Sequence, residues 1–136
     1  MSNLQAEEYK SFEEYAEFQN AGYMGLYGGL TVNDIHKKKN LGVTEKILDF
    51  MGSEELAANL FRITQTEAKL KRENVKTKEN ANQTHYTVGT TVRKAIKDIG
   101  GTMPEDLPTP EKSIKQVEKE QLKRLKNMKT KLMLDE

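Results

Sequence analysis

The stretch EELAANLFRITQTEAKLKREN, residues 54–74, decides the fold, because its apolar residues recur at the three- and four-residue spacing of an α-helix. Ser53 stands directly before it as a candidate N-cap. The apolar positions are Leu56, Leu60, Ile63 and Leu70, with Ala57, Phe61, Thr64 and Ala68 beside them. The spacing predicts a long helix that buries this broad face.

A second helical pattern follows after a short turn at 74–76. Thr77 with Asn80 provides a start signal, and Gly100 with Gly101 provides a stop. The apolar stripe between them is Ala81, His85, Val88, Val92, Ile96 and Ile99. So short a connection predicts that the two helices form an antiparallel hairpin. Because alternating β-branched runs are missing from the chain, the predicted fold class is all-α.

Shorter elements are predicted before the hairpin. Ser11 and Glu14 form a capping-box pattern that begins a short helix ending at Gly22. The stretch GYMGLYGGL, residues 22–30, is predicted as a loop anchored by its tyrosines, because its glycines permit tight turns. Two further short helices are expected, bounded by Thr31 with Asp34 and by Thr44 with Gly52.

The C-terminal part divides into a strap and a last helix. TMPEDLPTP, residues 102–110, holds all three prolines and is predicted to be extended. Thr109 and Pro110 fit the start of a helix whose apolar residues are Ile114, Val117, Leu122, Leu125, Met128 and Leu132. The predicted organisation is a helical domain over 1–110 and a basic amphipathic helix over 111–136, packed on that domain or on a second copy.

Composition excludes several classes of protein. A chain of 136 residues is one domain at most, so a multi-domain enzyme is excluded. No apolar run has the length of a membrane span, and the acidic first ten residues do not resemble a secretory signal, so a cytoplasmic protein is expected. With no cysteine and two histidines, neither a disulfide nor a structural metal is expected.

The charge is segregated although the net charge is only +1. Residues 1–35 hold six acidic residues against one lysine, whereas residues 112–136 hold eight basic residues against four acidic ones. Apolar residues make up only 35% of the chain, so a compact monomer would bury little apolar surface. We therefore expect an extended helical protein or a homodimer.

The residues offer little for catalysis. His85 lies on the apolar stripe and is predicted to be a core histidine bonded to a neighbouring helix. His36 heads a lysine run and is expected on a solvated face. The sequence GLYGGL lacks the order of a phosphate-binding loop. No reactive group has a partner that would tune it, so neither an enzyme nor a cofactor is expected.

Polar residues share one face of the first long helix. They are Glu55, Asn59, Arg62, Thr66, Lys69 and Glu73. Two interpretations stand side by side: a solvated face, or a hydrogen-bond network to the next helix through Asn82, Thr84 or Tyr86. A ligand site is a third.

Basic residues form clusters along the chain. They are Lys37 to Lys39, Lys69 to Lys78, Arg93 to Lys97, and Lys112 to Lys131. Solvated faces are the default interpretation, and contacts to phosphates are the alternative. On the final helix, an apolar seam flanked by lysines is also typical of a helix that docks on a protein partner or on its own copy. A membrane-surface role would need bulky aromatic residues there, and none is present.

The chain resembles the carboxy-terminal region of the DNA damage-inducible protein D (DinD) family over about residues 12–118. The matching stretches are FQNAGYMGLYGGL at 18–30, IHKKKNLG at 35–42, KILDFMGSEELAANLFRITQTEAKLKRENV at 46–75, ANQTHYTVGTTVRKAI at 81–96, GGTMPEDLPTP at 100–110 and SIKQVE at 113–118. Longer members carry a Bro-type amino-terminal domain that has no counterpart in these residues. A stand-alone half, a separate subunit and a truncated chain all fit that difference.

The resemblance implies a role in the bacterial DNA-damage (SOS) response and an association with RecA recombinase filaments, without an enzymatic activity. The leading hypothesis is a helical interaction module that binds a protein or a protein–DNA filament. The residues predicted to contact that partner are Tyr23, Tyr27, Asn59, Arg62, Thr66, Lys69, Arg93 and Lys97. The alternatives are direct nucleic-acid binding through the lysine-rich helices, and a phage-type antirepressor or counter-defence protein that occludes a host regulator.

Overall fold

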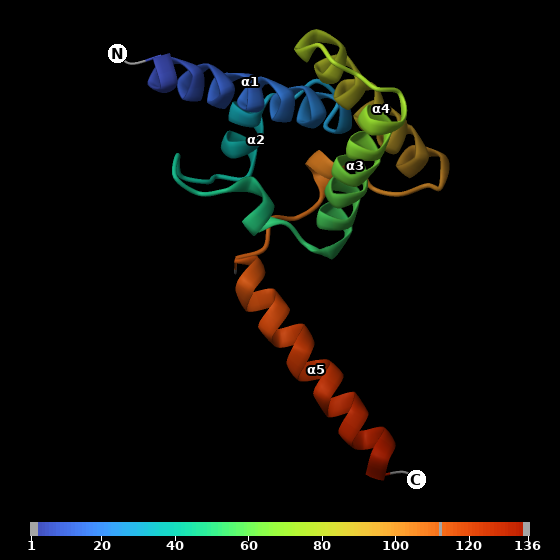
Figure 1. Ribbon diagram of the computed structural model, residues 1–136. Coiled ribbons are helices and arrows are strands. Elements are labelled where there is room, and N and C mark those ends of the chain that lie inside the picture. Colours follow the sequence, from blue (N-terminus) through green and yellow to red (C-terminus); the bar gives the residue numbers. More distant parts are fainter. Residues whose placement is uncertain (1–2, 112, 135–136) are drawn as a thin grey trace.

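The protein is helical throughout the part of the chain that the structure describes. A computed structural model describes residues 3–111 and 113–134. Its elements are α1 (Asn3–Leu26), α2 (Val32–Lys38), the 3-10 turn η1 (Ile47–Phe50), α3 (Ser53–Arg72), α4 (Lys78–Asp98), the 3-10 turn η2 (Pro104–Asp106) and α5 (Ile114–Leu134). No strand occurs among these residues, so the all-α prediction is confirmed. Helices α1 to α4 pack together into one body. The start of α1 and most of α5 extend from this body (Figure 1).

Helix α1 is much longer than predicted, because it begins at Asn3 and not at Ser11, and because most of the expected glycine–tyrosine loop is helical. The helix continues through Gly22 and Gly25 and ends at Leu26. Only Gly28 and Gly29 have the positive φ angles that favour glycine. The prediction of a loop over 22–30 is therefore wrong for its first five residues. The glycines inside the helix serve packing, as the contact between α1 and α4 shows.

The backbones of α1 and α4 approach closely where both carry glycine. A Cβ atom placed on Gly25 would lie 2.3 Å from the carbonyl oxygen of Tyr86, and one placed on Gly89 would lie 2.8 Å from the amide nitrogen of Leu26. Helix α4 packs more extensively on α1 than on α3. Helices α3 and α4 do contact each other across their short connection, but the predicted hairpin left out the main partner of α4.

Helix-end signals predict the boundaries of α2 and α4. The Thr31 side chain accepts a hydrogen bond from the backbone of Asp34, and the Asp34 carboxylate accepts one from the backbone of Thr31, which confirms the capping box. Thr77 caps α4 as predicted, and that helix ends just before Gly100, whose φ is +77°. The N-cap of α3 is Gly52, so the assignment of Ser53 as the cap is wrong by one residue.

Three short predictions need correction. The helix expected over 44–52 is only the 3-10 turn η1, and the strap over 102–110 contains the turn η2. Helix α5 begins at Ile114 and not at Pro110. Helix α5 contacts the body chiefly at η1 and then extends away from it (Figure 1). The apolar residues Leu122 and Leu125 are therefore exposed. Packing of α5 on a second copy stays a prediction.

The apolar core is small and lies where α1, α2, η1, α3 and α4 meet. Its buried members are Tyr23, Leu26, Tyr27, Ile35, Ile47, Met51 and Val92. Tyr23 and Leu26 belong to α1, Tyr27 follows it directly, and Val92 belongs to α4. The close contact between these two helices therefore contributes four of the seven core residues. A substitution that separates α1 from α4 should therefore weaken the whole fold.

We predict that Gly89→Ala destabilises the protein. The added methyl group collides with backbone atoms of α1, which cannot rotate away as a side chain can, so the free energy of unfolding should fall by about 1 to 3 kcal/mol. Urea unfolding measures this change. Gly52→Ala is the control for the steric effect, because a Cβ atom there meets no atom within 4 Å and its cost should be limited to the weaker N-cap that alanine provides for α3. Equal stability of the two variants would contradict the role of Gly89.

Candidate functional site

Helix α3 buries its polar face, which reverses the first prediction made for it. The side chains of Leu60 and Phe61 are about half exposed, at 48% and 55%. The fully buried residues of the helix are Glu55, Asn59, Arg62 and Thr66, each at most 1% exposed. Of the two interpretations of the polar row, the solvated face is wrong for these four residues. The predicted network to the next helix is only partly right, because Arg62 reaches α4 through His85 and not through Asn82, Thr84 or Tyr86. Thr66 donates to the backbone of Arg62 in its own helix, and Glu55 binds Tyr27 and Lys39, which directly follow α1 and α2.

A buried ion pair forms one end of the network. The Nζ atom of Lys39 lies 2.7 Å from Oε1 of Glu55, and both side chains are at most 6% exposed. Lys39 also donates to the carbonyl oxygen of Phe50 at 3.2 Å. The hydroxyl of Tyr27 donates to the second carboxylate oxygen of Glu55. The prediction of a solvated face is therefore wrong for Lys39, which is part of the core.

Asn59 joins the ion pair to the rest of the network. Its amide nitrogen donates to the Tyr27 hydroxyl oxygen at 3.1 Å and to the backbone oxygen of Glu55 at 2.9 Å. Its side-chain oxygen accepts from Nη2 of Arg62 at 2.9 Å. An amide suits this place because it can both donate and accept, and it therefore links an acceptor on one side with a donor on the other.

Arg62 places a positive charge in the middle of the protein. Its guanidinium carbon lies 4.6 Å from the ring centre of Tyr23, and its Nη1 lies 2.5 Å from Nε2 of His85. Gly22 leaves the space for it, because a Cβ atom there would lie 2.4 Å from Nη1. Burial lowers the pKa of Arg62, and nearby Tyr23 partly opposes that effect. The Nε atom has no hydrogen-bond partner among the described residues.

His85 is a core histidine, as the sequence predicts. Its Nδ1 lies 2.8 Å from the carbonyl oxygen of Phe18 on α1, and its ring lies 4.3 Å from the Phe18 ring. We assign the proton to Nδ1, because that atom faces an acceptor while Nε2 faces a donor of Arg62. Burial, reinforced by the charge of Arg62, lowers the pKa of His85 to about 4. The imidazole is therefore neutral at pH 7.

Five of the eight residues predicted to contact a partner are buried. They are Tyr23, Tyr27, Asn59, Arg62 and Thr66. Their assignment to a binding surface is wrong in this structure, because the polar row is the inner face of α3 and these side chains bind one another or the adjacent backbone. Of the rest, Lys69 pairs with Glu73 at 3.0 Å, and Arg93 lies with Lys97 around a shallow hollow beside Met103.

Arg93 holds the strap against the end of α1. Its Nη1 donates to the carbonyl oxygen of Leu26 at 3.1 Å and lies 2.7 Å from the Glu105 carboxylate. The hydrogen bond with Glu105 raises the pKa of Arg93. Arg93 therefore has a structural task, since it satisfies the last carbonyl of α1 and fixes η2 at the same time.

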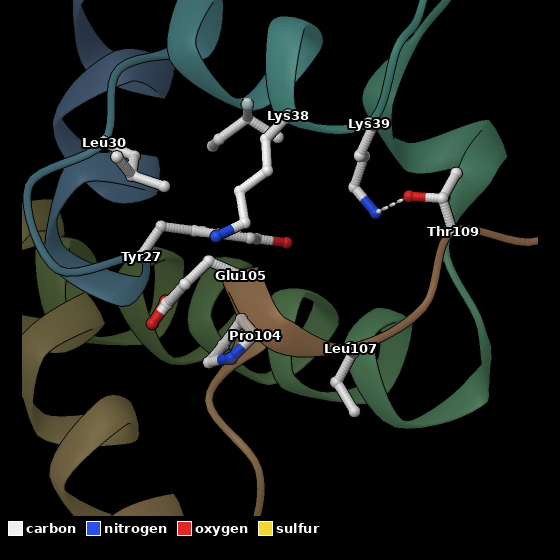
Figure 2. A pocket seen from close by; sticks show the side chains of 9 residues that line it. Tyr27, Leu30, Lys38, Lys39, Pro104, Glu105, Leu107 and Thr109 are labelled. Carbon is white, nitrogen blue, oxygen red and sulfur yellow. Dashed lines mark hydrogen bonds between the residues drawn. The ribbon is translucent and has the colours of Figure 1, made fainter.

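A small pocket with several polar side chains lies between α2 and the strap, and Lys39 of the ion pair forms part of its lining. Figure 2 shows Lys38 reaching across Tyr27, while Lys39 points toward Thr109. The volume is about 180 Å³. This is below the roughly 300 to 1,000 Å³ that is usual for small-molecule sites. Its polar groups are also engaged already, since Lys39 pairs with Glu55 and Glu105 with Arg93.

A larger apolar groove lies between α3, α4 and the strap, with a volume of about 600 Å³. Phe61 and Ile99 stand at its edge and are largely exposed, Ile99 at 83%. The other lining residues are Glu54, Ala57, Ala58, Val92, Ala95, Ile96, Gly101, Thr102, Pro104 and Leu107. The helical spacing predicts that most of these apolar residues lie in the core. An apolar stripe has the same pattern whether the chain itself or a partner covers it, so the sequence holds no signal for this groove.

The described residues show no arrangement for metal chemistry. No three His, Asp or Glu side chains gather in the described part of the chain. Four buried ionisable groups have partners within the network: Lys39, Glu55, Arg62 and His85. None of them lines the apolar groove of about 600 Å³. No helix in the described ranges is both long and apolar enough to cross a membrane.

Comparisons with known proteins agree with the resemblance found in the sequence. The model of the DinD C-terminal domain family matches residues 5–117. The chain belongs to this family. It is 62% identical over 105 residues to the DNA damage-inducible protein D of Escherichia coli (strain K12). That match covers 77% of this chain and 38% of the relative. No solved structure matches the chain.

The family match places the whole network and the groove inside the DinD C-terminal domain. The network extends from Phe18 to His85 and the groove from Glu54 to Leu107, and both lie within residues 5–117. Most of α5 follows the matched region. The matched region therefore includes the body of the structure and the first residues of α5.

We predict that Lys39→Met destabilises the domain more than the double variant Lys39→Met/Glu55→Gln. The single change leaves a buried carboxylate without its cation, which should lower the free energy of unfolding by about 3 to 5 kcal/mol. In the double variant the neutral amide still accepts from Tyr27, so part of the loss should return. Urea unfolding of both variants measures the difference. A double variant as unstable as the single one would contradict a charge effect.

We predict that the low pKa of His85 makes the free energy of unfolding fall in mild acid. The pKa of His85 is about 4 in the folded protein and about 6.5 in the unfolded chain. Between these two pH values His85 is therefore protonated in the unfolded chain but neutral in the folded protein. Above pH 6.5 neither state is protonated and the contribution is constant. Between pH 6.5 and 4 this residue should remove up to about 3 kcal/mol from the free energy of unfolding.

His85→Gln is the control for this pH dependence, because glutamine does not titrate. Carboxylates titrate in the same window, so the quantity to measure is the pH slope of the wild type minus that of His85→Gln. A steeper wild-type slope between pH 6.5 and 4 is expected. Equal slopes would show that His85 does not resist protonation in the folded state.

Proposed function

We propose that this chain is a non-enzymatic interaction module of the DNA-damage response that binds a protein partner through the apolar groove between α3 and α4. The observation that carries the proposal is the groove itself. It is lined mainly by apolar side chains, and Phe61 and Ile99 remain largely exposed at its edge. An exposed apolar patch of this kind is typical of a protein interface.

The shape of the groove favours a helix or an apolar loop as the bound element. Ala57, Ala58 and Ala95 form part of its lining, and their small side chains allow another backbone to come close. Phe61 can then cover one side of the inserted segment and Ile99 the other. The groove has few polar groups, so a partner would gain affinity mostly from buried apolar surface.

Family membership supports the biological setting. The relative from Escherichia coli is named a DNA damage-inducible protein, and its matched part is this domain. RecA filaments on single-stranded DNA are the partner that the family resemblance proposes, and a cytoplasmic location follows from that partner. The match covers 38% of the relative, so activities of the whole relative come to this chain only as proposals.

We predict that the chain alters the assembly of RecA filaments on single-stranded DNA and that Ala57→Arg removes this effect. The arginine side chain fills the groove and leaves the core intact, since Ala57 is exposed. Filament assembly, followed by light scattering or by fluorescence of labelled DNA, measures the effect. At least about a tenfold loss of apparent affinity is expected, equivalent to about 1.4 kcal/mol.

Ala68→Arg is the matched control, because Ala68 is an exposed alanine of the same helix and does not line the groove. It should act like the wild type. Unchanged filament kinetics at excess wild-type protein would overturn the RecA proposal. An equal loss in both variants would show that the groove is not the contact surface.

Direct nucleic-acid binding is a second candidate, and the turn between α3 and α4 favours it. Four exposed basic residues lie at the end of α3, in the connection and at the start of α4: Lys71, Arg72, Lys76 and Lys78. Phosphate contacts would make the affinity for DNA fall steeply as salt rises, whereas an apolar groove contact responds weakly. A salt titration of each binding event therefore separates the two functions.

A further inference from the structure

Helix α5 presents an apolar face that the described part of its own chain does not cover. Its exposed apolar residues Leu122, Leu125, Met128 and Leu132 recur at three- and four-residue spacing. Figure 1 shows that the helix contacts the body near its start and then extends away from it. Ile114–Leu134 holds seven basic residues against two acidic ones, a local charge of +5. A partner for this face should be apolar along its centre and acidic at its edges.

The first half of α1 has these properties. Phe12 and Tyr15 are 72% and 59% exposed, one helical turn apart. Asn3–Leu26 holds five acidic residues against one lysine, a local charge of −4, and all six lie before Phe18. This half also extends beyond the body in Figure 1, because α1 packs on α4 through its later, glycine-rich turns. The chain therefore carries two helical arms of opposite charge, and the large apolar side chains described on them are exposed.

We propose that two copies of this chain associate reciprocally, with α5 of each copy packed on the first half of α1 of the other. Within one chain the arms leave the body in different directions (Figure 1), so the complementary faces do not meet. A reciprocal exchange covers both arms of both copies and closes the assembly at two chains. The contact uses neither the groove nor the buried network, so it is independent of the proposed function.

Side-chain positions on the two helices agree with this pairing. On α1, Glu13 lies about 100° from Phe12 around the helix axis, and Glu14 lies about 100° from Tyr15 on the other side. On α5, Arg124 and Lys126 lie about 100° to either side of Leu125. Each apolar ridge thus has a charged residue on both flanks, and the two ridges carry opposite signs.

Pairing of α5 with itself fits less well. Two such helices side by side would bring charges of +5 and +5 together, which opposes association. The positions that continue the seam toward the start of the helix, Glu118 and Gln121, are polar. An acidic apolar face removes both objections, because it supplies opposite charge and needs only the last turns of α5.

Charge reversal on each arm tests the proposal with the full chain. The first variant is Glu13→Lys/Glu14→Lys, and the second is Arg124→Glu/Lys126→Glu. Sedimentation velocity at low salt should show the wild type as a dimer and each variant alone with a dissociation constant raised at least about tenfold, because like charges then face each other. An equimolar mixture of the two variants should dimerise again, because every arm then meets its opposite.

Controls come from the opposite faces of the same helices. Glu17→Lys and Lys123→Glu change the net charge in the same direction as the two test variants, each by one reversal instead of two. Both side chains point away from the apolar ridges, so both variants should leave the dimer unchanged. Circular dichroism shows whether each variant keeps its helix content. Ala57→Arg should also dimerise, which separates failure here from failure of the groove.

Several results would overturn the proposal. A wild type that stays monomeric at high concentration would do so, as would a mixture of variants that remains monomeric. A dimer that survives reversal on α5 but not substitution of Leu125 would indicate self-pairing of α5. A monomer that binds single-stranded DNA, and loses that binding on reversal of α5 alone, would assign the helix to nucleic acid.

Discussion

The guanidinium of Arg62 lies at the centre of the protein, and the surrounding elements are arranged to hold it. Tyr23 supplies a ring face, Asn59 an oxygen and His85 a neutral nitrogen. None of these groups is an anion, so the charge is stabilised by dipoles and a ring quadrupole instead of an ion pair. This arrangement demands that His85 stay neutral, and its proton on Nδ1 is in turn held by the backbone of α1.

The network explains why α1, α3 and α4 have their observed positions. Gly22 must lack a side chain, because Arg62 and His85 occupy the space beside it. Gly25 and Gly89 then bring the two backbones close enough for His85 to reach Phe18. The ion pair between Lys39 and Glu55 attaches α2 to the same face of α3. A polar centre of this kind can specify one arrangement of helices, since any other would leave buried charges without partners.

Burial of polar residues has a consequence for the outer surface. Because α3 turns its polar row inward, Leu60 and Phe61 face outward, and the apolar groove forms beside α4. Few apolar residues of the protein are therefore buried in the core, and many are exposed in the groove and along α5. That distribution is unusual for an isolated monomer and agrees with a protein whose apolar faces are covered by other chains.

The amino-acid sequence by itself determined the helical class, the capping of α2 and α4, the core position of His85 and the family. These features depend on local signals: the spacing of apolar residues, the caps Thr31 and Thr77, and long ordered matches. Tertiary structure decided which face of α3 is buried, that Gly22 and Gly25 belong to a helix, and that Arg62 is a core residue. The physical reason is that helical periodicity shows that two faces differ but not which of them is covered. A buried arginine becomes acceptable only when Tyr23, Asn59 and His85, separated by up to 62 positions in the chain, meet around it.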